Sequence, residues 1–179
     1  MVSMIICVAA LFSGLLFLAC AWTTRAGYWR TAAALMGGLA AAALRFGVDM
    51  AAFHLDLWTF GETAYAPVVT YVPVMFWFGA GLGLVGWRMI RNWGAVGELA
   101  FFAGFVLLGL GRDLLLATGN SALSFGQGPL PLVAAALSWL AMAILVQMAM
   151  QLLVGSVDSD DLAPERIPQI EDDASVGWS

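Results

Sequence analysis

The sequence contains no lysine, and its seven basic residues are all arginines. A cofactor held through a lysine Schiff base, such as retinal or pyridoxal phosphate, is therefore excluded, and so is a Walker-type phosphate site. The chain has one histidine, His54, so it cannot by itself supply a bis-histidine haem site or a three-histidine metal site. The sequence thus predicts no metal site and identifies no cofactor.

Charged residues are also scarce. They make up 11% of the 179 residues, whereas 62% are hydrophobic, and the mean hydropathy is +0.90. Soluble domains carry about 25% charged and about 45–50% apolar residues, so a soluble fold of this size could not bury so much apolar surface. We therefore expect an integral membrane protein whose main partner is the lipid bilayer, with a bacterial cytoplasmic (inner) membrane as its expected location. The net charge is −5 and no basic surface is indicated, so no nucleic-acid partner is expected.

Five apolar stretches are each long enough to cross about 30 Å of hydrocarbon as a helix. Because unpaired backbone groups cannot lie in lipid, helices are required there. The expected fold is all-α, a polytopic five-transmembrane-helix bundle. It is expected to form one domain over residues 1–157, with spans near 2–22, 31–53, 67–87, 95–117 and 130–154.

The arginines predict the orientation of these spans. The connection after the first span carries Arg25 and Arg30, and the connection after the third carries Arg88 and Arg91. The other two connections carry no basic residue. Because cytoplasmic loops are enriched in arginine and lysine, we expect the amino terminus outside and the carboxyl terminus in the cytoplasm.

The last 22 residues, 158–179, differ from the rest of the chain. They hold seven of the twelve acidic residues together with Pro164 and Pro168. Such a composition cannot bury enough apolar surface to form a core, so we expect a disordered or loosely held cytoplasmic tail. The alternative is a tail that docks a basic cytoplasmic partner.

Four charged residues lie inside the apolar stretches: Arg45, Asp49, Arg112 and Asp113. An ionised group in hydrocarbon costs at least ~2.5–3.5 kcal/mol, so these side chains are expected to pair with one another. Arg45 and Asp49 are four residues apart and share a helical face. Arg112 and Asp113 are adjacent and are predicted to point in different directions, so at least one of them is expected to find a partner on another helix. The expected cross-helix pair is Arg112 with Asp49, or Asp113 with Arg45.

All four charges are predicted to lie in the outer half of the membrane. Asp56 and His54 are expected just above them, with Asp56 near the face of Asp49 if the helix continues. Two interpretations remain open for the four membrane charges. They clamp the helices together, or they line an outward-facing polar pocket for an ion, a proton or a small polar ligand. His54 is either an interface side chain or a proton relay or ligand together with Asp56.

A faint internal repeat relates the two charged stretches. The first reads Arg45, Asp49 and Trp77, and the second reads Arg112, Asp113 and Trp139. Chance agreement in an apolar sequence is the alternative. If the repeat is real, the two aspartates approach a common axis and form one site.

Three functions fit these features. The first is a small transport or ligand-binding protein with a charged pocket in the outer half of the bundle. The second is an accessory subunit of a larger respiratory or photosynthetic membrane complex, with other membrane subunits or a second copy of the chain as partners. The third is a membrane-embedded enzyme acting on a lipid or isoprenoid, although the sequence holds no complete catalytic set.

Overall fold

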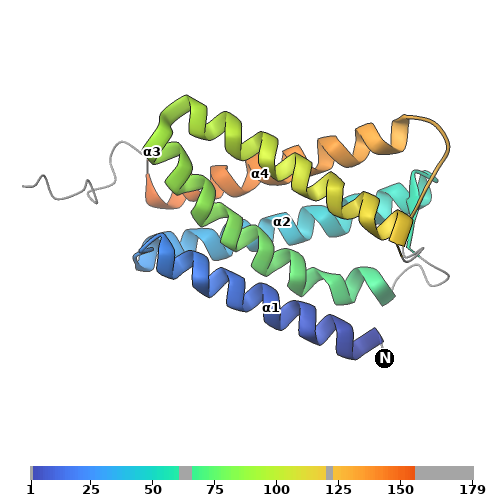
Figure 1. Ribbon diagram of the computed structural model, residues 1–179, viewed down its shortest axis with the longest axis horizontal. Helices are drawn as coiled ribbons and strands as arrows, with labels where there is room; N and C mark the ends of the chain where they lie inside the picture. Colours follow the sequence, from blue (N-terminus) through green and yellow to red (C-terminus); the bar gives the residue numbers. More distant parts are fainter. Residues whose placement is uncertain (1, 61–65, 120–122, 156–179) are drawn as a thin grey trace, which may run out of the picture.

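The computed structural model describes residues 2–60, 66–119 and 123–155. These residues form α1 (Val2–Thr23), α2 (Tyr28–His54), α3 (Ala66–Gly119) and α4 (Leu130–Val154), with two short strands, β1 (Trp58–Thr59) and β2 (Ser124–Phe125) (Figure 1). The predicted all-α class is confirmed for this part of the chain. The predicted tail, 158–179, lies outside the described residues.

The long helix α3 is interrupted at Gly94, where the backbone adopts φ 54° and ψ −134°. Side chains strongly disfavour this conformation, and glycine adopts it freely. Figure 1 shows the chain reversing its direction at this point. We call residues 66–93 the first segment of α3 and residues 95–119 its second segment. A side chain at Gly97 would overlap the Met89 carbonyl, so the two segments approach closely beside the break.

Within the part of the chain that the structure describes, three helices are long and apolar enough to cross a membrane: Tyr28–His54, Val72–Thr118, which contains the Gly94 break, and Leu130–Val154. A shorter apolar helix covers Ala10–Thr23. Large hydrophobic side chains such as Leu99, Leu115 and Leu152 are more than two-thirds exposed, which suits lipid and not water. The chain is therefore an integral membrane protein.

Helix α2 packs against both α3 and α4, whereas α1 packs against α3. Small residues allow the close approach of α2 and α3. A Cβ atom on Gly38 would overlap the Phe76 carbonyl, and a Cβ atom on Gly79 would lie 3.1 Å from that of Ala41. In lipid, helices associate through such close backbone packing, because burial from water contributes nothing there.

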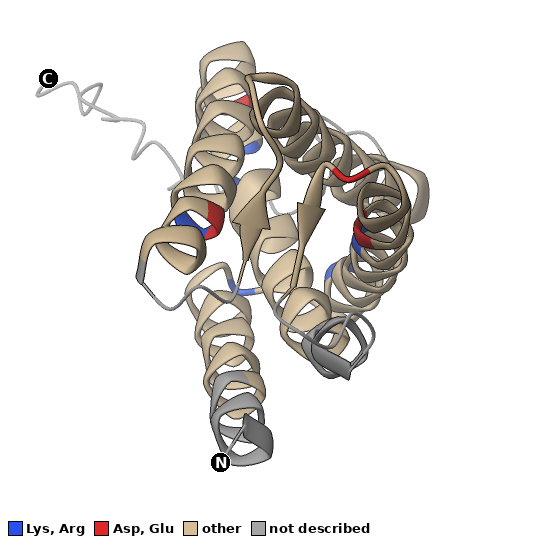
Figure 2. Cartoon of the chain, turned by 90° about the vertical axis from the view of Figure 1, so that its right-hand side faces the viewer, with Lys and Arg blue, Asp and Glu red and all other residues tan. Residues whose placement is uncertain are grey.

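A short strand pair joins two connections at one end of the bundle (Figure 2). Trp58 pairs with Phe125 and Thr59 with Ser124 in antiparallel register, and the Gly126 amide donates to the Leu57 carbonyl at 2.8 Å. Beneath the strands, Ala52, Trp58, Leu123 and Ala135 form a small buried apolar cluster. The connection between α2 and α3 is therefore tied to the connection between α3 and α4, which the sequence did not predict.

Candidate functional site

Arg45 lies at the centre of the buried polar groups near the end of the bundle that carries β1 and β2, with only 2% of its side chain exposed. Its Nε lies 3.0 Å from Asp49 Oδ1, one turn along α2. Its Nη2 donates to Asp113 Oδ2 on α3 at 3.4 Å, and its Nη1 lies 3.5 Å from Ser138 Oγ on α4. One guanidinium thus contacts polar groups of three helices.

Each carboxylate also accepts a hydrogen bond from a tryptophan. The Trp58 indole nitrogen donates to Asp49 Oδ1 at 3.1 Å, and the Trp139 indole nitrogen donates to Asp113 Oδ2 at 2.7 Å. Arg112 Nη1 donates to the other oxygen of Asp113 at 2.7 Å. We call the whole set the Arg45 cluster: Arg45, Asp49, Arg112, Asp113, Ser138, Trp58 and Trp139.

The tryptophans also contact the arginines through their ring faces. Arg45 Cζ lies 4.8 Å from the Trp139 ring centroid and 5.8 Å from that of Trp58, and Arg112 Cζ lies 5.8 Å from the Trp139 centroid. A guanidinium at these distances is attracted by the ring quadrupole. Trp139 lies against the backbone of Gly109, where a Cβ atom would overlap its indole. The absence of a side chain at Gly109 therefore allows Trp139 to approach Asp113.

The formal charges of the four groups balance one another, because two arginines meet two aspartates. Removing an ion from water costs several kcal/mol, which a low-dielectric ion pair offsets only when hydrogen bonds satisfy the remaining polar atoms. Asp49 and Asp113 each combine an arginine contact with an indole hydrogen bond, and both are at most 2% exposed. The cluster therefore meets the condition for holding charge inside an apolar bundle.

Arg112 is the partly open member of this set, with 25% of its side chain exposed. It lies seven residues before Gly119, the last residue of α3, which corresponds to about 10 Å along the helix axis. The cluster therefore approaches the outside of the bundle through Arg112.

The structure tests two expectations about pairing. Of the two cross-helix pairs considered, Arg45 with Asp113 is confirmed. The expectation that Arg112 and Asp113 point in different directions is wrong, because their side chains are 2.7 Å apart. The Cα–Cβ bonds of neighbouring helical residues diverge by about 100°, but the long arginine side chain spans that divergence.

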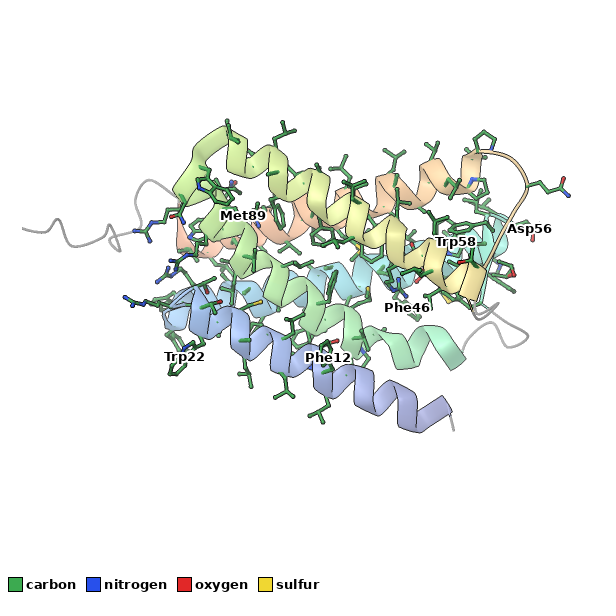
Figure 3. The ribbon with its side chains drawn as sticks, in the orientation of Figure 1. Phe12, Trp22, Phe46, Asp56, Trp58 and Met89 are labelled. Atoms are coloured by element: carbon green, nitrogen blue, oxygen red, sulfur yellow. The ribbon has the colours of Figure 1, made fainter. Side chains whose placement is uncertain are left out.

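The structure places His54 and Asp56 away from the cluster. Helix α2 ends at His54, and Asp56 adopts a positive φ of 53° as the chain turns toward β1. The helix therefore does not continue to Asp56, so the condition for Asp56 to lie near the face of Asp49 is not met. Both side chains are exposed, and the described contact of the His54 ring is with Phe53. Figure 3 shows Asp56 at the edge of this end and Trp58 further inside.

Three members of the cluster were not among the predicted site residues. They are Trp58, Trp139 and Ser138. A usable signal existed for the tryptophans, because a buried indole N–H needs an acceptor and carboxylates are scarce in these helices. Trp77, the partner of Trp139 in the proposed repeat, instead packs against Phe17 with ring centroids 5.4 Å apart.

Over residues 2–60, 66–119 and 123–155, no three His, Cys, Asp or Glu side chains gather in a way that could hold a metal ion. A scan against protein-family models gives no match, and searches of curated proteins and of solved structures find no similar protein. The functional argument therefore depends on the geometry of the Arg45 cluster.

Proposed function

We propose that this chain is a small membrane transport or ligand-binding protein that takes up a small anionic or polar ligand at the Arg45 cluster. The supporting observation is that a set of four balancing formal charges reaches the surface of the bundle through one partly exposed arginine, Arg112. Ionisable residues within membrane helices commonly mark ion or substrate pathways.

The proposed entry step is an exchange of partners at Arg112. A ligand arriving from its exposed side would compete with Asp113 for the guanidinium. Asp113 would keep its hydrogen bond from Trp139 and its contact with Arg45, so its charge would remain paired. Arg45 has no comparable freedom, because it is 2% exposed and its removal would affect both carboxylates.

The proposed topology has five crossings: α1, α2, the two segments of α3, and α4. We place the amino terminus outside and the carboxyl terminus in the cytoplasm, because Arg25, Arg30, Arg88 and Arg91 belong to the opposite end from the cluster. The cluster then lies in the outer half of a bacterial cytoplasmic membrane. Cysteine labelling at position 56 and at position 92 from each side of intact cells tests this orientation.

Two experiments test the proposed function. Native mass spectrometry of gently extracted protein should show a bound small molecule that is lost in Arg112→Gln. In proteoliposomes, proton flux reported by pyranine and chloride flux reported by a quenched dye should be measured for the same variant. Arg166→Gln removes an identical charge outside the cluster and is the matched control. A wild type without bound molecule and without either flux would contradict the proposal.

A second function, an accessory subunit of a larger membrane complex, is favoured by a different observation. The buried members of the cluster are bonded to one another, as expected if their role is to fix the helices. Under this proposal, mild detergent extraction should recover partner subunits or a second copy of the chain. Arg112→Gln should then leave that assembly intact.

A further inference from the structure

The end of the bundle opposite the Arg45 cluster gathers positive charge from three elements. Arg25 lies in the turn after α1, Arg30 in the first turn of α2, and Arg88 and Arg91 near the end of the first segment of α3. Among the described residues close to these arginines in the sequence, the acidic residue is Glu98, which lies near the start of the second segment of α3. In Figure 3, nitrogen-rich side chains gather at the end where Trp22 is labelled.

Two hydrogen bonds bring these arginines around the end of α1. Arg88 Nη1 donates to the Thr23 carbonyl at 3.3 Å, and Arg30 Nη2 donates to the Arg25 carbonyl at 3.1 Å. The Arg88 guanidinium is therefore held two residues along the chain from Arg25. Both Arg25 and Arg88 are exposed, whereas Arg30 is buried. The exposed pair is thus available to an external group.

The backbone of Arg25 adopts a left-handed conformation, with a φ of 49°. This conformation commonly ends a helix, and here the Ala26 amide donates to the Ala21 carbonyl at 3.0 Å across the turn after α1. The conformation places an exposed cation at the tight turn between α1 and α2.

Exposed aromatic residues surround the same turn. Trp22 is 85% exposed, Tyr28 80% and Trp29 70%, and Trp93 beside the α3 break is 61% exposed. In membrane proteins, tryptophan and tyrosine of this kind lie at the level of the lipid headgroups. The arginines between them therefore lie at the depth of the lipid phosphates.

We propose that Arg25 and Arg88 bind the phosphate of an anionic phospholipid. A guanidinium offers five N–H donors in a planar arrangement that matches phosphate oxygens, and Arg88 uses one of them on Thr23. An anion between the two arginines also relieves the repulsion of their like charges. Lipid is favoured over a soluble anion or an acidic protein segment, because the flanking aromatic residues belong at the lipid interface.

The test measures lipid retention by the full chain in a nonionic detergent. Native mass spectrometry measures the lipid bound to the protein during titration with phosphatidylglycerol, which is anionic, and with phosphatidylcholine, which is zwitterionic. Each arginine at an anionic surface typically contributes about fivefold in binding, so Arg25→Gln/Arg88→Gln should weaken phosphatidylglycerol binding about 25-fold. Arg166→Gln should leave it unchanged. Should the double variant fail to fold, Arg25→Gln alone should still give the fivefold loss, because the described hydrogen bonds of Arg25 use its backbone and not its side chain.

Four results would overturn the proposal. They are unchanged phosphatidylglycerol binding in the arginine variants, an equal loss in Arg166→Gln, equal binding of phosphatidylcholine, and displacement by millimolar inorganic phosphate at constant ionic strength. Deleting residues 158–179 should leave lipid binding unchanged or raise it. A loss of binding on this deletion would assign recognition to the acidic tail instead.

Discussion

Arg45 and Asp113 are 68 residues apart in sequence, and their side chains meet at 3.4 Å between Nη2 and Oδ2 inside an apolar bundle. This contact joins α2 to the second segment of α3. Its strength is measurable by a double-mutant cycle.

We expect Arg45→Gln and Asp113→Asn to show a coupling energy of about 1–3 kcal/mol, because both groups are almost fully buried. With the exposed side of Arg112 facing water at the outer surface, as in the proposed orientation, Arg112→Gln with Asp113→Asn should show less than about 1 kcal/mol, because Arg112 is 25% exposed. The Arg112 contact is shorter, but screening at a partly exposed site weakens a charge pair several-fold, which outweighs the difference in distance. Reversible unfolding in mixed micelles measures both cycles, and equal coupling energies would contradict this ranking.

Trp58→Phe and Trp139→Phe should each destabilise the protein by about 1.5–3 kcal/mol, because each removes a hydrogen bond to a buried carboxylate and keeps an aromatic ring. Trp77→Phe is the matched control, since its indole packs against Phe17 and Gly14. The same unfolding assay should give a clearly smaller change for this control. A change as large as that of the other two variants would show that the effect is one of ring size.

Gly109→Ala should be strongly destabilising, by about 1–3 kcal/mol or more, because the added Cβ would overlap the Trp139 indole. Gly104→Ala, on the same segment of α3, places its Cβ where no heavy atom lies within 4 Å. Alanine favours a helix interior over glycine by about 1 kcal/mol, so this control should be neutral or stabilising. Thermal unfolding in detergent compares them, and a destabilised Gly104→Ala would indicate a partner on that face.

His54→Ala and Asp56→Asn should change stability by less than about 0.5 kcal/mol, because both side chains are exposed and lie outside the Arg45 cluster. Ligand retention in native mass spectrometry should also stay at the wild-type level. Loss of the ligand in either variant would show that His54 or Asp56 contributes to ligand binding. Asp49→Asn, which alters the cluster itself, serves as the positive control for both measurements.

The helical class and the pairing of the charges could be predicted because they depend on simple physical rules. Apolar length requires helices, and the cost of charge in hydrocarbon requires partners, which led to two alternative cross-helix pairs, of which Arg45 with Asp113 is the one that forms. Features that depend on a single backbone angle were harder to predict from the sequence. The end of α2 at His54 and the positive φ of Asp56 separate Asp56 from Asp49, and helical periodicity contains no sign of either.

The internal repeat illustrates the same limit. The repeat expected the two aspartates to approach each other, and both contact Arg45. The two tryptophans that it aligned are not equivalent, because Trp139 donates a hydrogen bond to Asp113, whereas Asp49 accepts its indole hydrogen bond from Trp58 in β1. Two-residue strands such as β1 and β2 carry too little pattern to be recognised before their tertiary contacts are known.

The sharing of the Arg45 guanidinium between two carboxylates has a consequence for local opening of the bundle. If α2 alone moved away from α3, Asp113 would lose one cation while Arg45 lost one anion, both still far from water. Fraying of a single helix at this end is therefore costly, and α2, α3 and α4 should open together or not at all. Hydrogen exchange should accordingly report one common protection factor for the backbone amides around Arg45, Asp113 and Ser138.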